Sequence, residues 1–151
     1  DRNLKMLIDI WTKLIIPNND KLRLLVTDNS YDYSEKSIIK RKLSDQRDLV
    51  KDLKSARMIL IPGHKAELYC LAAEEARELC IPIVTLGMGC LAERVEHGKT
   101  GYCAKNKREF ADFTLELFKN DKLWLSMREN LTKVRGINNW KKVAHSLISQ
   151  I

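Results

Sequence analysis

The chain has 151 residues, with 27 Lys and Arg against 20 Asp and Glu, and 44% of its residues are hydrophobic. This length fits one domain with a single core and is too short for a two-domain enzyme of ordinary size. The charged fraction of 31% and the spread of apolar residues exclude a disordered chain. No apolar run approaches the ~20 residues that span a bilayer. The net charge of +7 fits either an ordinary basic domain or one that binds a polyanion.

Hydrophobic periodicity predicts alternating helices and strands in chain order. Helices are expected at roughly 3–15, 68–79 and 91–95, and then around 110–118, 124–131 and 140–148. A further helix is expected to begin after Ser44, its N-cap, and to run through Leu53. Strands are expected at 22–27, 38–40, 58–61, 82–86 and 102–104, where short apolar runs occur. Residues 28–34 are polar and are expected to form a loop.

The strand segments are continuous apolar runs, which is typical of a parallel sheet covered on both faces. We therefore predict a single α/β domain over residues 1–151. It is a Rossmann-like, doubly wound parallel sheet with helices on both faces and a helical C-terminal tail. Ligands of such sheets bind beyond the carboxyl ends of the strands. Five of the six glycines lie between Gly63 and Gly101, in loops near those ends, where they serve either turns or close approach to a ligand.

Cysteine spacing and the basic clusters argue against two other kinds of site. The four cysteines form no C-x-x-C pair and no zinc-like spacing with histidine, so we expect free thiols, a cytoplasmic protein and no metal site. The basic clusters at 40–42 and 105–108 are short and hold no interleaved aromatic residues. We therefore expect no nucleic-acid partner, although the charge alone keeps that hypothesis open.

The most informative stretch is residues 62–101, PGHKAELYCLAAEEARELCIPIVTLGMGCLAERVEHGKTG. It holds two glutamates eight positions apart, Glu67 and Glu75, with the triplet Tyr-Cys-Leu at 69–71 between them. A Gly-rich turn and the segment VEHGKTG at 95–101 follow in order. This ordered set resembles the donor-binding half of the group 1 family of retaining glycosyltransferases, which have two Rossmann-like domains (the GT-B fold).

The resemblance implies a role for each site residue. The glutamate at Glu67 is the catalytic residue that faces the donor sugar, and the one at Glu75 binds the ribose. The implied donor-binding residues are Arg2, Tyr69, Cys70, Leu71 and Glu75. A loop leading into a helix N-terminus suits a diphosphate. Eight residues at helical rise would place the two glutamates roughly 12 Å apart, comparable to the sugar-to-ribose distance.

Structural alternatives stand beside these roles. Glu74, Glu75 and Glu78 could form an ordinary solvated helix face, and Glu67 could merely occupy the first turn of the helix. The sequence also departs from the family at Cys70, where a glycine is usual, so the backbone there is expected to be less free. Arg41 and Lys42 stand where the family has a small residue near the base pocket.

The resemblance also implies a larger context. The chain would be the C-terminal half of a two-domain enzyme, with its first strand truncated and the N-terminal acceptor-binding domain missing. We expect a hexosyltransferase-type enzyme that uses a nucleotide-diphosphate sugar and no cofactor, and a fragment inactive by itself. The full-length parent is a candidate for peripheral association with the cytoplasmic membrane surface. The alternative is a non-catalytic nucleotide or nucleotide-sugar binding module of the same fold.

Overall fold

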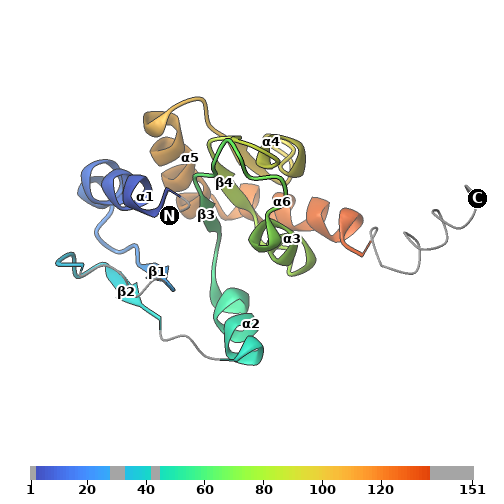
Figure 1. The fold of residues 1–151 in the computed structure, drawn as a ribbon, viewed down its shortest axis with the longest axis horizontal. Coiled ribbons are helices and arrows are strands. Elements are labelled where there is room, and N and C mark those ends of the chain that lie inside the picture. The colour runs from blue at the N-terminus through green and yellow to red at the C-terminus, as the bar shows by residue number, and fades with distance from the viewer. Residues whose placement is uncertain (1–2, 28–32, 42–44, 137–151) are drawn as a thin grey trace, which may run out of the picture.

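Helices and strands alternate along the part of the chain that the computed structural model describes, residues 3–27, 33–41 and 45–136 (Figure 1). The strands are β1 (Leu24–Val26), β2 (Ile38–Lys40), β3 (Ile59–Ile61), β4 (Ile83–Thr85) and β5 (Gly101–Cys103). The helices are α1 (Leu4–Ile10), α2 (Gln46–Ser55), α3 (Leu71–Glu78), α4 (Leu91–Arg94), α5 (Lys107–Lys119) and α6 (Asp121–Val134). The first helix continues as a π-helical turn, Trp11–Ile15, and a 3-10 turn, Ile16–Asn18.

Every strand pair in the described residues is parallel. β1 pairs with β2, and β4 lies between β3 and β5 in a second sheet. Figure 1 shows β1 and β2 lying together, with β3 beside β4 in the centre of the molecule. Parallel strands put their carboxyl ends at one edge of the sheet, so the loops that follow β3 and β4 meet there.

Apolar side chains cover β4 from both faces, as predicted for a sheet between two helical layers. One core cluster joins α1, α5 and α6 to β1, β2 and the Val84 face of β4. A second cluster joins α3 and α4 to the opposite face of β4, which carries Ile83. The alternation of neighbouring side chains in one strand between two helical layers is the signature of a doubly wound sheet. The predicted α/β, Rossmann-like fold is confirmed.

Asparagine and aspartate side chains set several helix starts. Asp45 caps α2 by accepting from the backbone N–H groups of Arg47 and Asp48, at 2.9 and 3.0 Å. The predicted cap, Ser44, lies outside the described residues, and the observed cap stands one position later. Asn106 caps α5 in the same way, and Asn120 caps α6. These caps satisfy N–H groups that have no partner within their own helix.

Two other predictions need correction or fall outside the described residues. The helix expected from about residue 68 begins only at Leu71. The reason is that the carbonyl oxygen of Glu67 accepts from the N–H of Cys90, at 3.0 Å, and so does not accept from Leu71, as a helix through Glu67 would require. The closing helix expected near 140–148 lies outside the described residues. No helix in the described ranges has both the length and the apolar character needed to cross a bilayer.

Candidate functional site

The candidate residues gather at the carboxyl edge of the β3-β4-β5 sheet. The loop after β3 carries Glu67, and it leads through Tyr69 and Cys70 into α3, where Glu75 lies. The loop after β4 carries Gly89 and lies against the first loop. Arg2, the remaining predicted donor-binding residue, lies outside the described residues.

Gly89, in the loop after β4, packs closely against the backbone of the loop after β3. Its φ is +61°, and a Cβ added there would lie 2.6 Å from the carbonyl oxygens of both His64 and Glu67. The N–H of Glu67 donates to the carbonyl of His64 at 3.0 Å, and the N–H of Cys90 donates to the carbonyl of Glu67 at 3.0 Å. Only glycine combines this backbone conformation with so close an approach. The backbone of Glu67 is therefore held from both sides.

The carboxylate group of Glu67 is shielded from solvent. Both of its carboxylate oxygens are inaccessible to solvent. Burial raises the pKa of the neighbouring Cys70 thiol, and the negative charge of Glu67 beside it raises that pKa further. Glu67 precedes α3 by four positions, so the first-turn alternative is wrong; the acidic residue of the first turn is Glu74. The predicted separation of roughly 12 Å between Glu67 and Glu75 does not apply either, because helical rise gives that distance only if Glu67 lies on the helix.

The N-terminus of α3 lacks a side-chain cap. Cys70 is its N-cap residue, with φ of −107° and ψ of 98°, and its thiol makes no capping hydrogen bond. The carbonyl of Cys70 accepts from the N–H groups of Ala73 and Glu74, at 3.1 and 3.3 Å. The N–H groups of Leu71 and Ala72 thus open the helix without help from a side chain. A φ of −107° suits any residue, so the conformation at Cys70 does not require the family's glycine.

Apolar side chains surround this helix start on the outside. Leu68 and Leu71 are 91% and 64% exposed. Tyr69 is 55% exposed, and the guanidinium of Arg94 lies over its ring, 4.5 Å from the centroid. These three exposed apolar side chains lie within four positions of the chain, which makes this loop a candidate interaction site.

The comparison with known families agrees with this geometry. The sequence model of a family described as glycosyl transferases group 1 matches residues 1–134. The chain belongs to this family. A search of curated proteins returned no match.

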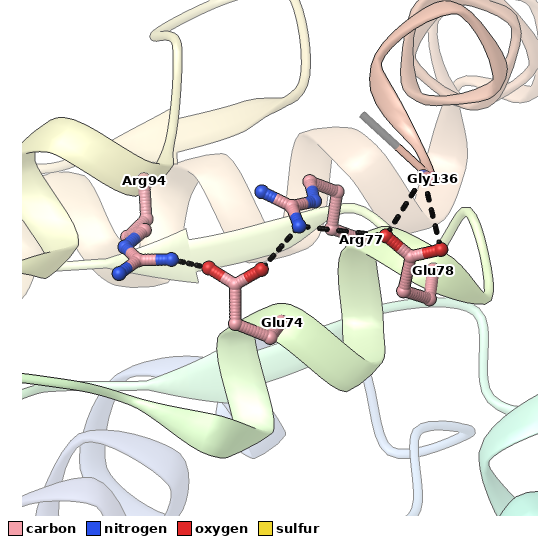
Figure 2. A network of polar contacts seen from close by, with 5 residues as sticks. All are labelled: Glu74, Arg77, Glu78, Arg94 and Gly136. Atoms are coloured by element: carbon pink, nitrogen blue, oxygen red, sulfur yellow. Dashed lines mark hydrogen bonds and ion pairs between the residues drawn. The ribbon is translucent and has the colours of Figure 1, made fainter. Parts of the chain in front are cut away.

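An ion-pair network involves the helix α3 that follows the candidate loop (Figure 2). Glu74 of α3 pairs with both Arg94 and Arg77, and its side chain is only 14% exposed. Arg77 also approaches Glu78 at 3.4 Å, and the carboxylate of Glu78 accepts from the N–H of Gly136 at 3.0 and 3.1 Å. The network ties α3 to α4 and to the residue beyond α6, as Figure 2 shows.

The ion-pair network decides the role of Glu74 but not that of Glu75. The alternative of a solvated helix face is wrong for Glu74, whose carboxylate is already bound to two guanidinium groups. The spacing of Glu74 and Arg77 is a visible i,i+3 pair in the sequence. Arg94 comes from another helix, so no local signal predicts its contribution. The assignment of the ribose to Glu75 remains a prediction.

Other charged and histidine residues in the domain have structural roles. Arg41 is buried and pairs with Asp52 of α2, which removes it from any basic surface cluster. The ring Nδ1 of His97 lies 3.1 Å from the carbonyl oxygen of Cys103, and the ring packs edge-on against Tyr102. All four thiols are free, as predicted. Within the described ranges, no group of three or more Cys, His, Asp or Glu side chains is arranged to hold a metal ion.

Proposed function

We propose that this glycosyltransferase domain binds a nucleotide-diphosphate sugar and serves its transfer with retention of configuration. One observation carries the proposal. Both carboxylate oxygens of Glu67 are shielded from solvent, in the loop that leads to the uncapped N-terminus of α3, at the carboxyl edge of a parallel sheet. An uncapped helix start attracts a diphosphate, and a carboxylate beside it accepts hydrogen bonds from sugar hydroxyls.

In this proposal the residues share the donor between them. The N–H groups at the start of α3 bind the diphosphate, whose negative charge grows as the nucleoside diphosphate leaves. Glu75, one turn into the helix, accepts hydrogen bonds from the ribose hydroxyls. Tyr69, Cys70 and Leu71 contribute backbone around the phosphates, and Arg2 is the candidate cation from the first residues.

Glu67 contributes chiefly to the transition state. In the full-length enzyme, Glu67→Gln keeps the size of the side chain and removes its charge. We expect kcat to fall strongly while the affinity for free nucleoside diphosphate stays nearly unchanged. Steady-state kinetics and calorimetry on the same variant measure both quantities. Normal turnover in Glu67→Gln would refute the catalytic role.

Nucleotide binding is the decisive experiment for the donor. A thermal-shift screen of nucleoside diphosphates and their sugars should identify one base, because a ligand at ~100 times its dissociation constant adds about 2.7 kcal/mol of stability. Glu75→Ala should then weaken nucleoside diphosphate binding by roughly 1.5–3 kcal/mol. Glu78→Ala, on the same helix and outside the proposed site, is the matched control. Equal affinities of the two variants would contradict the role of Glu75.

The finer assignments follow from the same proposal. We expect a hexosyl donor, transfer without a metal, and no turnover by residues 1–151 without an acceptor-binding domain. Binding of the donor without any transfer by the full-length protein would instead indicate the non-catalytic module.

A further inference from the structure

One arginine of α4 contacts the start of α3 on both sides of its open N–H groups. The guanidinium of Arg94 lies 4.5 Å from the centroid of the Tyr69 ring, in the loop before the helix. The same side chain forms an ion pair with Glu74, in the first turn of the helix. Along the chain, the N–H groups of Leu71 and Ala72 lie between these two contacts. Arg94 therefore contacts both ends of the segment that opens α3.

The contact with Arg94 restrains a ring that burial does not hold. Tyr69 is more than half exposed, so apolar packing covers only part of its surface. A guanidinium over the face of an aromatic ring is attracted by the negative charge density of that face. The cation thus limits the positions that the ring, and with it the backbone next to the helix start, can take.

Glu74 in turn holds the guanidinium of Arg94. The Glu74 side chain is largely buried and lies between Arg94 and Arg77, as Figure 2 shows. Solvent and salt screen such a shielded pair only weakly, so it fixes geometry better than an exposed pair does. Because Arg94 belongs to α4, which follows the loop after β4, the pair also ties that loop to α3.

The same ion pairs remove an electrostatic conflict at the helix start. A carboxylate in the first turn of a helix stabilises the helix N-terminus. The same charge would repel a diphosphate bound there. Because Glu74 pairs with two guanidinium groups, the three side chains together carry a net positive charge. The start of α3 therefore keeps a field that favours an anion.

We propose that Arg94 is a positioning residue for the diphosphate of the donor. It holds the start of α3 in the geometry in which the N–H groups of Leu71 and Ala72 bind the phosphate oxygens. Arg94 acts through Tyr69 and Glu74 and does not itself contact the donor. This role rests on the proposed nucleotide-sugar site and adds to it a residue from the neighbouring helix.

Arg77 offers a matched comparison for Arg94. Each arginine pairs with Glu74, and the two side chains are similarly shielded, at 20% and 25% exposed. The other ion pair of Arg77 is with Glu78, at the C-terminal end of α3. Replacing either arginine by methionine therefore takes one guanidinium and one positive charge from Glu74. Only the replacement of Arg94 also removes the contact with the Tyr69 ring.

Calorimetric titration of the full-length enzyme tests the proposal, at a temperature well below its melting temperature. UDP, ADP, GDP and CDP are titrated into the unchanged protein, and the one that binds is then titrated into Arg94→Met and Arg77→Met. Both variants should melt at lower temperature, because each weakens the ion-pair network. Arg94→Met should weaken diphosphate binding about 10-fold more than Arg77→Met does. Equal affinities in the two variants would overturn the role of Arg94, because a merely structural role lowers stability alone.

A double variant tests the route through the ring. Tyr69→Leu removes the aromatic face that Arg94 contacts and should itself weaken diphosphate binding. Tyr69→Leu combined with Arg94→Met should bind within about 2-fold of Arg94→Met alone, because the two residues act as one unit. Losses that multiply would refute this route. If the unchanged protein binds none of the four diphosphates, the proposed function falls, and the role of Arg94 with it.

Discussion

Gly89→Ala provides a sharp test of how the fold positions Glu67. The added methyl group would lie 2.6 Å from the carbonyl oxygens of His64 and Glu67 and 3.3 Å from the Cβ of Glu67. Two of these contacts are to backbone atoms, which cannot rotate away as a flexible side chain would. The loop before α3 must therefore shift, and the carboxylate of Glu67 must move with it.

Gly98→Ala isolates the part of the cost that comes from backbone conformation. Gly98 has φ of +77°, and a Cβ there would meet nothing within 4 Å. A left-handed conformation in a residue with a Cβ lowers the free energy of unfolding of both variants by about 1–2 kcal/mol. The steric overlap lowers that of Gly89→Ala by about 1–3 kcal/mol more. A difference of about 2 kcal/mol corresponds to roughly 4–8 °C in melting temperature for a domain of this size.

Thermal melting and turnover of the two variants measure these effects. We expect Gly89→Ala to melt lower than Gly98→Ala. If Glu67 has the proposed catalytic role, Gly89→Ala should also lose about 100-fold in kcat in the full-length enzyme, because a displacement near 1 Å misaligns a catalytic group. Gly98→Ala should retain most of the turnover. Equal melting temperatures and equal turnover would refute the conclusion that Gly89 holds Glu67 in place.

Three further predictions concern the ion-pair network, a buried tyrosine and the thiols. Glu74→Ala should lower the free energy of unfolding by about 1.5–3 kcal/mol in urea titrations, because it leaves two partly buried guanidinium groups without their carboxylate partner. Glu78 is more exposed, so Glu78→Ala should lower it by less than about 1 kcal/mol. Equal losses in the two variants would contradict the network. Burial, and then the charge of Glu116, raises the pKa of Tyr102 from 10.0 to about 12, so the unfolded chain loses this proton first and stability should fall as pH rises through that window. Tyr102→Phe should remove this decline in pH-dependent melting curves. Cys70, which is buried with a raised pKa, should react with alkylating reagents more slowly than the half-buried Cys90, as peptide mass spectrometry would detect.

The predicted elements agree with the structure wherever the signal is local. The strand expected at 38–40 has the same bounds as β2, and the apolar spacing of 3–15 continues through α1 and the π-helical turn. Apolar periodicity reports which side chains face a core, and this does not require knowing which other element supplies that core.

The start of α3 is a boundary that local sequence signals do not predict. Residues 68–70 have no strong helix breaker, so the sequence predicts a helix that runs through them. The carbonyl of Glu67 instead bonds the N–H of Cys90, a residue 23 positions later in the chain. The order of glutamates still marks the candidate site, because the motif is contained within one continuous stretch.

By itself, the sequence determined the class of fold, the order of elements and the group of residues from Glu67 to Glu75 as the candidate site. Only the tertiary structure decided that Glu67 lies in a loop beneath Gly89, that Glu74 belongs to an ion-pair network, and that Arg94 of α4 contacts the start of α3. The physical reason is the range of the interactions. Periodicity, capping and motif spacing act within one turn or one strand, whereas loop contacts, ion pairs between helices and strand order depend on segments that only folding brings together.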